Sequence, residues 1–192
     1  MAPHAASISL CLLLMLKSFA AAVPTVQAEV AEPVLEELMG GCSLRCAFSW
    51  SVEVTEPDGK PEITQRLNDE SATTAWTSAA QGGGVGTKFR LLFPAKLTVE
   101  QDRTPVYGLD LINGNWKNEP LWREHARLKK VRLFYKRKAL QDVVFADSRR
   151  WQRVLFPDIY VRAGDYLTVE VLEVYPAAKG LALSEFVLEG AH

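Results

Sequence analysis

The stretch NGNWKNEPLWREHAR, residues 113–127, gathers aromatic and hydrogen-bonding side chains within fifteen positions. A flat indole ring can cover the apolar face of a sugar, while amide, ammonium, imidazole and guanidinium groups can hold its hydroxyls. The stretch lies between two expected strands, where binding residues tend to lie. We therefore expect a carbohydrate site formed by Asn113, Asn115, Trp116, Lys117, Trp122, His125 and Arg127, with Arg123 beside them.

A structural interpretation of the same stretch stays open. Trp116 and Trp122 would then pack the loop against the domain, because tryptophan is usually well buried, and the charged groups would be solvated. Asn113 and Gly114 have the residue types of a turn under either interpretation.

Motifs of catalysis and of nucleotide binding are missing. The chain contains neither GxSxG nor HExxH. Its glycine-rich stretch QGGGVGTKFRLLF, residues 81–93, lacks the Lys-Ser or Lys-Thr of a phosphate loop and leads into a strand pattern instead of a helix. A carboxylate pair for glycoside hydrolysis stays an open alternative, since such pairs come together only in three dimensions. We expect a protein that is not an enzyme.

The elements that must position these groups are predicted to be strands. In AFSWSVEVT, residues 47–55, apolar side chains alternate with polar ones, as in a half-buried strand. Further strands are expected at 87–93, 96–100, 106–112, 130–136, 140–146, 150–156, 166–175 and 182–188, and only 118–126 has the pattern of a helical turn. Short strands separated by Pro, Gly, Asp and Asn predict one all-β sandwich or jelly roll.

Composition excludes some classes of partner. The chain has 192 residues, is 48% hydrophobic and carries 22 basic against 23 acidic residues, which indicates one globular domain and no nucleic-acid binding. The basic residues of 127–138 include Lys130 and Arg132, which alternate with Val131 and Leu133 and so predict a solvated sheet face. Weak affinity for anionic polysaccharide stays an alternative.

The N-terminus has the pattern of a secretory signal. Ile8–Leu16 is apolar but too short to span a bilayer, and small residues follow it. We predict a signal peptide at 1–28, cleaved after Ala28, a linker at 29–41 and the domain at 42–190, in a secreted or periplasmic protein without membrane insertion. In such a compartment Cys42 and Cys46 are expected to form a local disulfide; two free thiols are the alternative.

Several motifs occur in a fixed order along the chain. They are CSLRC at 42–46, LNDESATTAW at 67–76, GGGVG at 82–86, YGLDLINGNWKN at 107–118, RLKKVRLFY at 127–135, VEVLEVYP at 169–176 and LSEFVLE at 183–189. The series resembles the discoidin-like, glycan-binding translocation domain of streptococcal NAD glycohydrolase, which is similar to coagulation-factor C-type and galactose-binding-like modules. The resemblance covers about residues 42–190.

This resemblance implies a discoidin-like jelly-roll sandwich and a glycan or other cell-surface ligand as partner. It does not imply NAD cleavage, which belongs to a separate catalytic region in those toxins. It also implies a structural calcium at Asp69, Ser71, Thr74 and Glu185, for which the alternative is a loop held by Asp69 and Thr74 hydrogen bonds alone. A module that serves structure or protein interaction without sugar binding is the second functional hypothesis.

Overall fold

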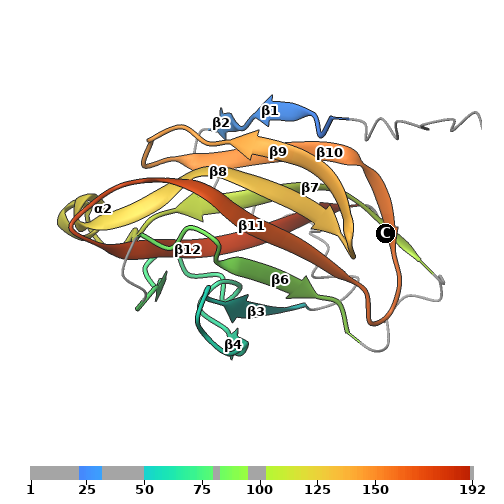
Figure 1. Ribbon diagram of the computed structural model, residues 1–192, viewed down its shortest axis with the longest axis horizontal. Coiled ribbons are helices and arrows are strands. Elements are labelled where there is room, and N and C mark those ends of the chain that lie inside the picture. The colour runs from blue at the N-terminus through green and yellow to red at the C-terminus, as the bar shows by residue number, and fades with distance from the viewer. Residues whose placement is uncertain (1–21, 32–49, 80–82, 95–102, 191–192) are drawn as a thin grey trace, which may run out of the picture.

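The structure is a computed structural model that describes residues 22–31, 50–79, 83–94 and 103–190, and the regular structure of these residues is nearly all β-strand (Figure 1). The strands are β1 (Thr25–Gln27), β2 (Glu29–Ala31), β3 (Ser51–Thr55), β4 (Glu62–Thr64), β5 (Trp76–Thr77), β6 (Lys88–Leu92), β7 (Thr104–Asn113), β8 (His125–Tyr135), β9 (Lys138–Val144), β10 (Trp151–Val161), β11 (Tyr166–Tyr175) and β12 (Lys179–Gly190). One short helix, α2 (Glu119–Glu124), lies between β7 and β8. The expected strand at 96–100 and the two cysteines, Cys42 and Cys46, lie outside the described residues.

The strands form two layers that pack face to face. One layer has the order β1-β9-β8-β11-β6-β3-β4, and the other has the order β2-β10-β7-β12-β5. A short parallel contact joins the layers, where Lys179 and Leu181 of β12 pair with His125 and Ala126 of β8. The predicted all-β sandwich is confirmed.

Alternating apolar residues of both layers fill the space between them. Phe89 and Leu91 of β6 belong to the same buried cluster as Leu109 and Leu111 of β7, and all four are fully buried. The ring of Phe89 meets that of Trp76 edge to face, with 5.2 Å between the ring centres. This arrangement agrees with the period of two in the sequence.

The glycine-rich loop is a turn into β6, as its sequence predicted. Gly84 has a φ of +87°, and its carbonyl accepts a hydrogen bond of 3.1 Å from Thr87 N. A Cβ at Gly84 would lie 2.7 Å from Leu181 Cβ, so the loop needs a residue without a side chain here. Close packing against β12 therefore explains this glycine, and no phosphate ligand is needed to account for it.

The basic residues Lys130 and Arg132 of β8 are half-buried and paired with an acidic neighbour. Arg132 and Lys130 both contact the Asp142 carboxylate on the adjacent strand, at 2.6 and 3.2 Å. Arg132 lowers the pKa of Asp142, chiefly through its hydrogen bonds. The predicted alternation with the buried Val131 and Leu133 is present, and the two basic side chains on the other face are half-buried and ion-paired.

The first described residues form two short strands. Residues 29–31, expected in the linker, form β2, and the preceding residues form β1. Both are three-residue strands with too few side chains to show a period, so backbone pairing to β9 and β10 defines them. We call residues 25–31 the N-terminal strap.

The helix is short. α2 has six residues, and within the described ranges no helix is long and apolar enough to cross a membrane.

Candidate functional site

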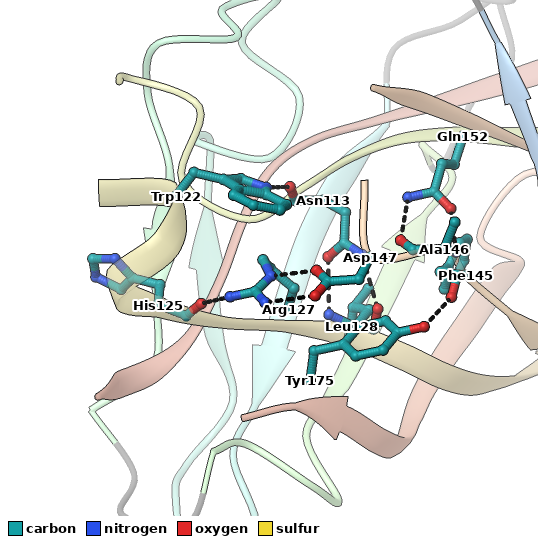
Figure 2. A network of polar contacts seen from close by, with 10 residues as sticks. All are labelled: Asn113, Trp122, His125, Arg127, Leu128, Phe145, Ala146, Asp147, Gln152 and Tyr175. Carbon is teal, nitrogen blue, oxygen red and sulfur yellow. Dashed lines mark hydrogen bonds and ion pairs between the residues drawn. The ribbon is translucent and has the colours of Figure 1, made fainter. Parts of the chain in front are cut away.

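The α2 end of the sandwich holds the predicted carbohydrate-binding stretch, and Figure 2 shows its polar network. The expected helical turn is present as α2. Its N-cap residue Asn118 accepts a hydrogen bond of 2.9 Å from Leu121 N, and Pro120 stands in the first turn, where its missing N–H costs nothing. Local sequence therefore builds the helix.

Arg127 anchors the start of β8. Its Nε and Nη2 donate to the two carboxylate oxygens of Asp147 at 2.8 and 3.0 Å, and its Nη1 donates to the carbonyl of His125 at 2.8 Å. The guanidinium lies over the ring of Trp122, with 4.6 Å from Cζ to the ring centre. Only 7% of Arg127 is exposed. Its guanidinium is therefore committed to the fold.

Asn113 ties the end of β7 to β8. Its Nδ2 donates to Leu128 O at 2.8 Å, and its Oδ1 accepts from Leu128 N at 2.9 Å. The side chain thus imitates a backbone pairing and is buried. The Asn113 amide is therefore committed to the fold and shielded from solvent.

Trp122 and His125 also bond to the backbone. Trp122 Nε1 donates to Asn113 O at 2.9 Å, and the ring lies against Gly114, where a Cβ would come within 2.6 Å of Cδ1. His125 Nδ1 lies 2.8 Å from Leu121 O, so this nitrogen carries the proton and donates. His125 is buried, whereas Trp122 is half-buried.

The other predicted residues lie on the outer side of the loop. Asn115 and Trp116 are half-buried and Lys117 is exposed. Trp116 packs against a small apolar cluster of Ile112, Trp151 and Val187 on the outer face of the second layer.

Backbone contacts from distant strands fix the orientation of Trp116. Trp116 N donates to Ser184 Oγ at 3.1 Å, and Arg149 Nη2 donates to Trp116 O at 2.9 Å. The Arg149 guanidinium also lies over the indole, 5.5 Å from its centre. Arg149 has no signal in the sequence pattern, because only the fold brings the loop between β9 and β10 beside this stretch.

The seven predicted residues thus form two groups. Asn113, Trp122, His125 and Arg127 join the loop to the strands, whereas Asn115, Trp116 and Lys117 present surface to solvent. The first four have the contacts that the structural interpretation expects. Ligand contact by any of the seven stays a prediction.

The loop predicted to hold calcium has its own hydrogen bonds. Thr74 Oγ1 donates to the Asp69 carboxylate, at 2.9 Å from Oδ1 and 2.7 Å from Oδ2, and Ser71 N donates to Asp69 Oδ1 at 3.0 Å. These are the contacts of an Asx turn. Glu185 is buried on β12.

These residues meet the needs of calcium only in part. They supply oxygens, but calcium takes six to eight of them and gains affinity from several carboxylates. The Asp69 carboxylate accepts from Thr74, and the described part of the chain contains no cluster of three or more His, Cys, Asp or Glu residues that could hold a metal. Calcium binding stays a prediction.

A second polar cluster lies on the outer face of β7, β10 and β12. Arg153 donates to both oxygens of Asp110, at 3.1 and 3.0 Å, and lies 2.7 Å from Glu189 Oε1. Burial, with a smaller contribution from the Asp110 charge, raises the pKa of Glu189 to about 7, against the opposing effect of Arg153. Glu189 therefore exchanges its proton near neutral pH, and the cluster joins three strands.

Comparison with known proteins agrees with this fold. A model of the NAD glycohydrolase translocation F5/8 type C domain matches residues 43–189. No curated protein sequence matches the chain.

Solved structures include similar folds. The CBM32-1 and CBM32-2 domains of Clostridium perfringens ZmpB in complex with GalNAc match with a TM-score of 0.58 and 8% identity, over 88% of this chain and 40% of that chain. A ZmpB structure that adds the M60 catalytic domain matches with a TM-score of 0.57 and 7% identity, over 91% of this chain and 17% of that one. At these identities the likeness shows the fold alone, and the chain spans less than half of either ZmpB structure.

Proposed function

Because the chain belongs to the NAD glycohydrolase translocation F5/8 type C domain family, we propose that it is a secreted, non-catalytic module that binds carbohydrate. The family and the fold shared with modules solved in complex with GalNAc support a glycan as partner. The apolar run Ile8–Leu16 supports export. The family resemblance expected from the sequence is confirmed.

The surface of Asn115, Trp116 and Lys117, with Arg149, is the proposed contact; we call it the Trp116 surface. The main supporting observation is that the half-buried Trp116 is held in place, because its backbone is bonded to Ser184 and Arg149. The exposed ammonium group of Lys117 lies next to it in the chain. A ring that is already held in place loses little entropy when a sugar packs against it. Amide and cationic donors around the ring can then select among hydroxyl patterns.

Trp122 has a supporting part in this proposal. Its N–H is bonded to Asn113 O and Arg127 covers one face of its ring. A ligand could contact only the part of the Trp122 ring that remains exposed. Arg149 lies over the Trp116 ring in a similar way, but Trp116 stands next to the exposed Lys117, so we rank it above Trp122 as the contact.

A glycan-array screen of the purified protein, in buffer with calcium, tests the function. We expect specific binding to at least one glycan class, with loss in Trp116→Ala. Tyr160→Ala is the matched aromatic control, because Tyr160 is 49% exposed and its backbone is bonded to Tyr135, at the end of β8 away from α2. An empty array from a folded protein would favour the protein-interaction module.

One pair of neighbouring carboxylates allows a test of the enzyme alternative. Asp110 and Glu189 are neighbouring carboxylates, but both are bonded to Arg153, as in a structural ion-pair cluster. Turnover of a glycan bound by the array, abolished in Asp110→Asn or Glu189→Gln, would contradict a non-catalytic module.

A further inference from the structure

The N-terminal strap connects the two layers at their open side. β1 runs parallel to β9, pairing Thr25 to Asp142 and Gln27 to Val144, and β2 runs antiparallel to β10, pairing Glu29 to Arg153. Figure 1 shows the strap along the edge formed by β9 and β10. Seven residues therefore cover an edge strand of each layer.

Backbone hydrogen bonds to β9 continue at both ends of β1. Asp142 N donates to Pro24 O at 2.8 Å, and Ala28 N donates to Val144 O at 2.8 Å. Unpaired groups on an edge strand invite pairing with other chains, and a covering strand removes that risk. The strap therefore completes the hydrogen bonding of β9 from residue 24 onward.

Side chains of the strap join both apolar clusters. Val26 and Ala28 pack against the main core between the layers, and Ala31 packs against the outer cluster of Ile112 and Trp151. Thr25, Gln27 and Glu29 point to solvent. From Thr25 to Glu29 exposed and half-buried residues alternate, and the half-buried ones lie on the sandwich.

Cleavage after Ala28, expected from the sequence, would remove β1 and separate Val26 and Ala28 from the core. An earlier small-residue segment is present. Ala20-Ala21-Ala22 has the small-x-small pattern of a cleavage site and lies directly before the strap, and it ends six residues after Leu16, the last residue of the apolar run. Val26-Gln27-Ala28 ends twelve residues after that run and within a paired strand.

We propose that the leader is cleaved after Ala22, so that the mature chain begins at Val23 and keeps the strap as its first structural element. The proposal rests on the export that forms part of the proposed function. It adds a processing site and assigns residues 23–31 to the working domain.

Expression of the full chain with its own leader in a Gram-negative bacterium tests the site. The protein is recovered from the periplasm or medium, and its intact mass and N-terminal residues are measured. We expect a start at Val23. An exported protein that starts at Glu29 would overturn the cleavage site and leave export standing, whereas an unprocessed cytoplasmic chain would overturn both.

A matched pair of substitutions tests the strap itself. Val26→Asp places a charge against the core, whereas Gln27→Asp places the same charge on the exposed side of the same strand. We expect the exported Val26→Asp protein to melt about 5 °C below the exported Gln27→Asp protein. Equal melting of the two would show that the strap does not belong to the core and would overturn the assignment.

Discussion

Arg127 and Asp147, which lie 20 positions apart in the sequence, form a bidentate ion pair with nitrogen–oxygen distances of 2.8 and 3.0 Å. The pair holds the start of β8 to the loop between β9 and β10. Since the Arg127 side chain is 9% exposed, the charge relies on this partner.

Loss of this pair should reduce stability. We expect Arg127→Ala to lower the free energy of unfolding by about 2–4 kcal/mol, since it leaves the His125 carbonyl and one side of Trp122 without their partner. Arg123→Ala is the control, because its ion pair with Glu119 is exposed and should contribute little. Denaturant unfolding measures both. Equal loss in the two variants would contradict a structural role for Arg127.

The close approach of Trp122 to Gly114 predicts a second stability difference. Gly114 has a φ of +88°, and a Cβ there would lie 2.6 Å from the indole. Gly164 has a φ of +78° and no atom within 4 Å of its Cβ position. Gly164→Ala should cost about 1 kcal/mol through backbone strain alone. Gly114→Ala should cost about 1–3 kcal/mol more, because the ring must move.

Thermal melting of the two glycine variants measures this difference. Near-ultraviolet circular dichroism of Gly114→Ala should also change, because the Trp122 environment changes. The same melting temperature and spectrum in both variants would argue against the packing of Trp122 on this turn.

Glu189 predicts a pH dependence of stability. Its pKa is about 7 in the folded protein, above the ordinary value of 4.5, so the folded state keeps a proton that the unfolded state releases earlier. Stability attributable to Glu189 is therefore full below about pH 4.5 and is lost as the pH rises through 7. Glu189→Gln, which cannot ionise, should flatten the decline between these values.

Melting temperatures from pH 4.5 to 8 check this prediction. The facing groups, Asp110, Arg153 and Glu29, are present in both proteins, so the difference between the two curves belongs to Glu189. Parallel curves would contradict the raised pKa.

The Asp69 loop supports a prediction about calcium. Asp69→Ala removes the acceptor for Thr74 and Ser71 and should cost about 1 kcal/mol whether or not calcium binds. If calcium is a structural ligand, a chelator lowers the melting temperature of the natural protein, added calcium restores it, and Asp69→Ala loses this response. An unchanged melting temperature would leave the hydrogen bonds as the support of the loop.

Local pattern predicted much of this fold. The alternation of Phe89 and Leu91 identified β6, and Tyr166–Tyr175 matches β11 to the residue. The strap falls within the predicted leader and linker, because three-residue strands are too short to show a side-chain period and depend on pairing with distant strands. A sequence pattern reveals strands whose side chains alternate between two faces, and it does not reveal short strands that are defined only by backbone pairing.

The sequence predicts which segment forms the candidate site, but it does not predict which of its side chains are buried and which are exposed. Residues 113–127 were identified by residue type, yet their division into buried anchors and an exposed surface depends on Asp147, Arg149 and Ser184. Ser184 is 68 residues from Trp116, beyond the reach of any local spacing rule.

The most direct test of the account is the dissociation constant of the best array glycan for the natural protein, Trp116→Ala and Tyr160→Ala, with melting curves of all three. Loss of one sugar-stacking ring should weaken binding at least tenfold in Trp116→Ala, a change of about 1.4 kcal/mol, while Tyr160→Ala binds normally. Unchanged affinity in a folded Trp116→Ala protein would contradict the Trp116 surface as the carbohydrate site.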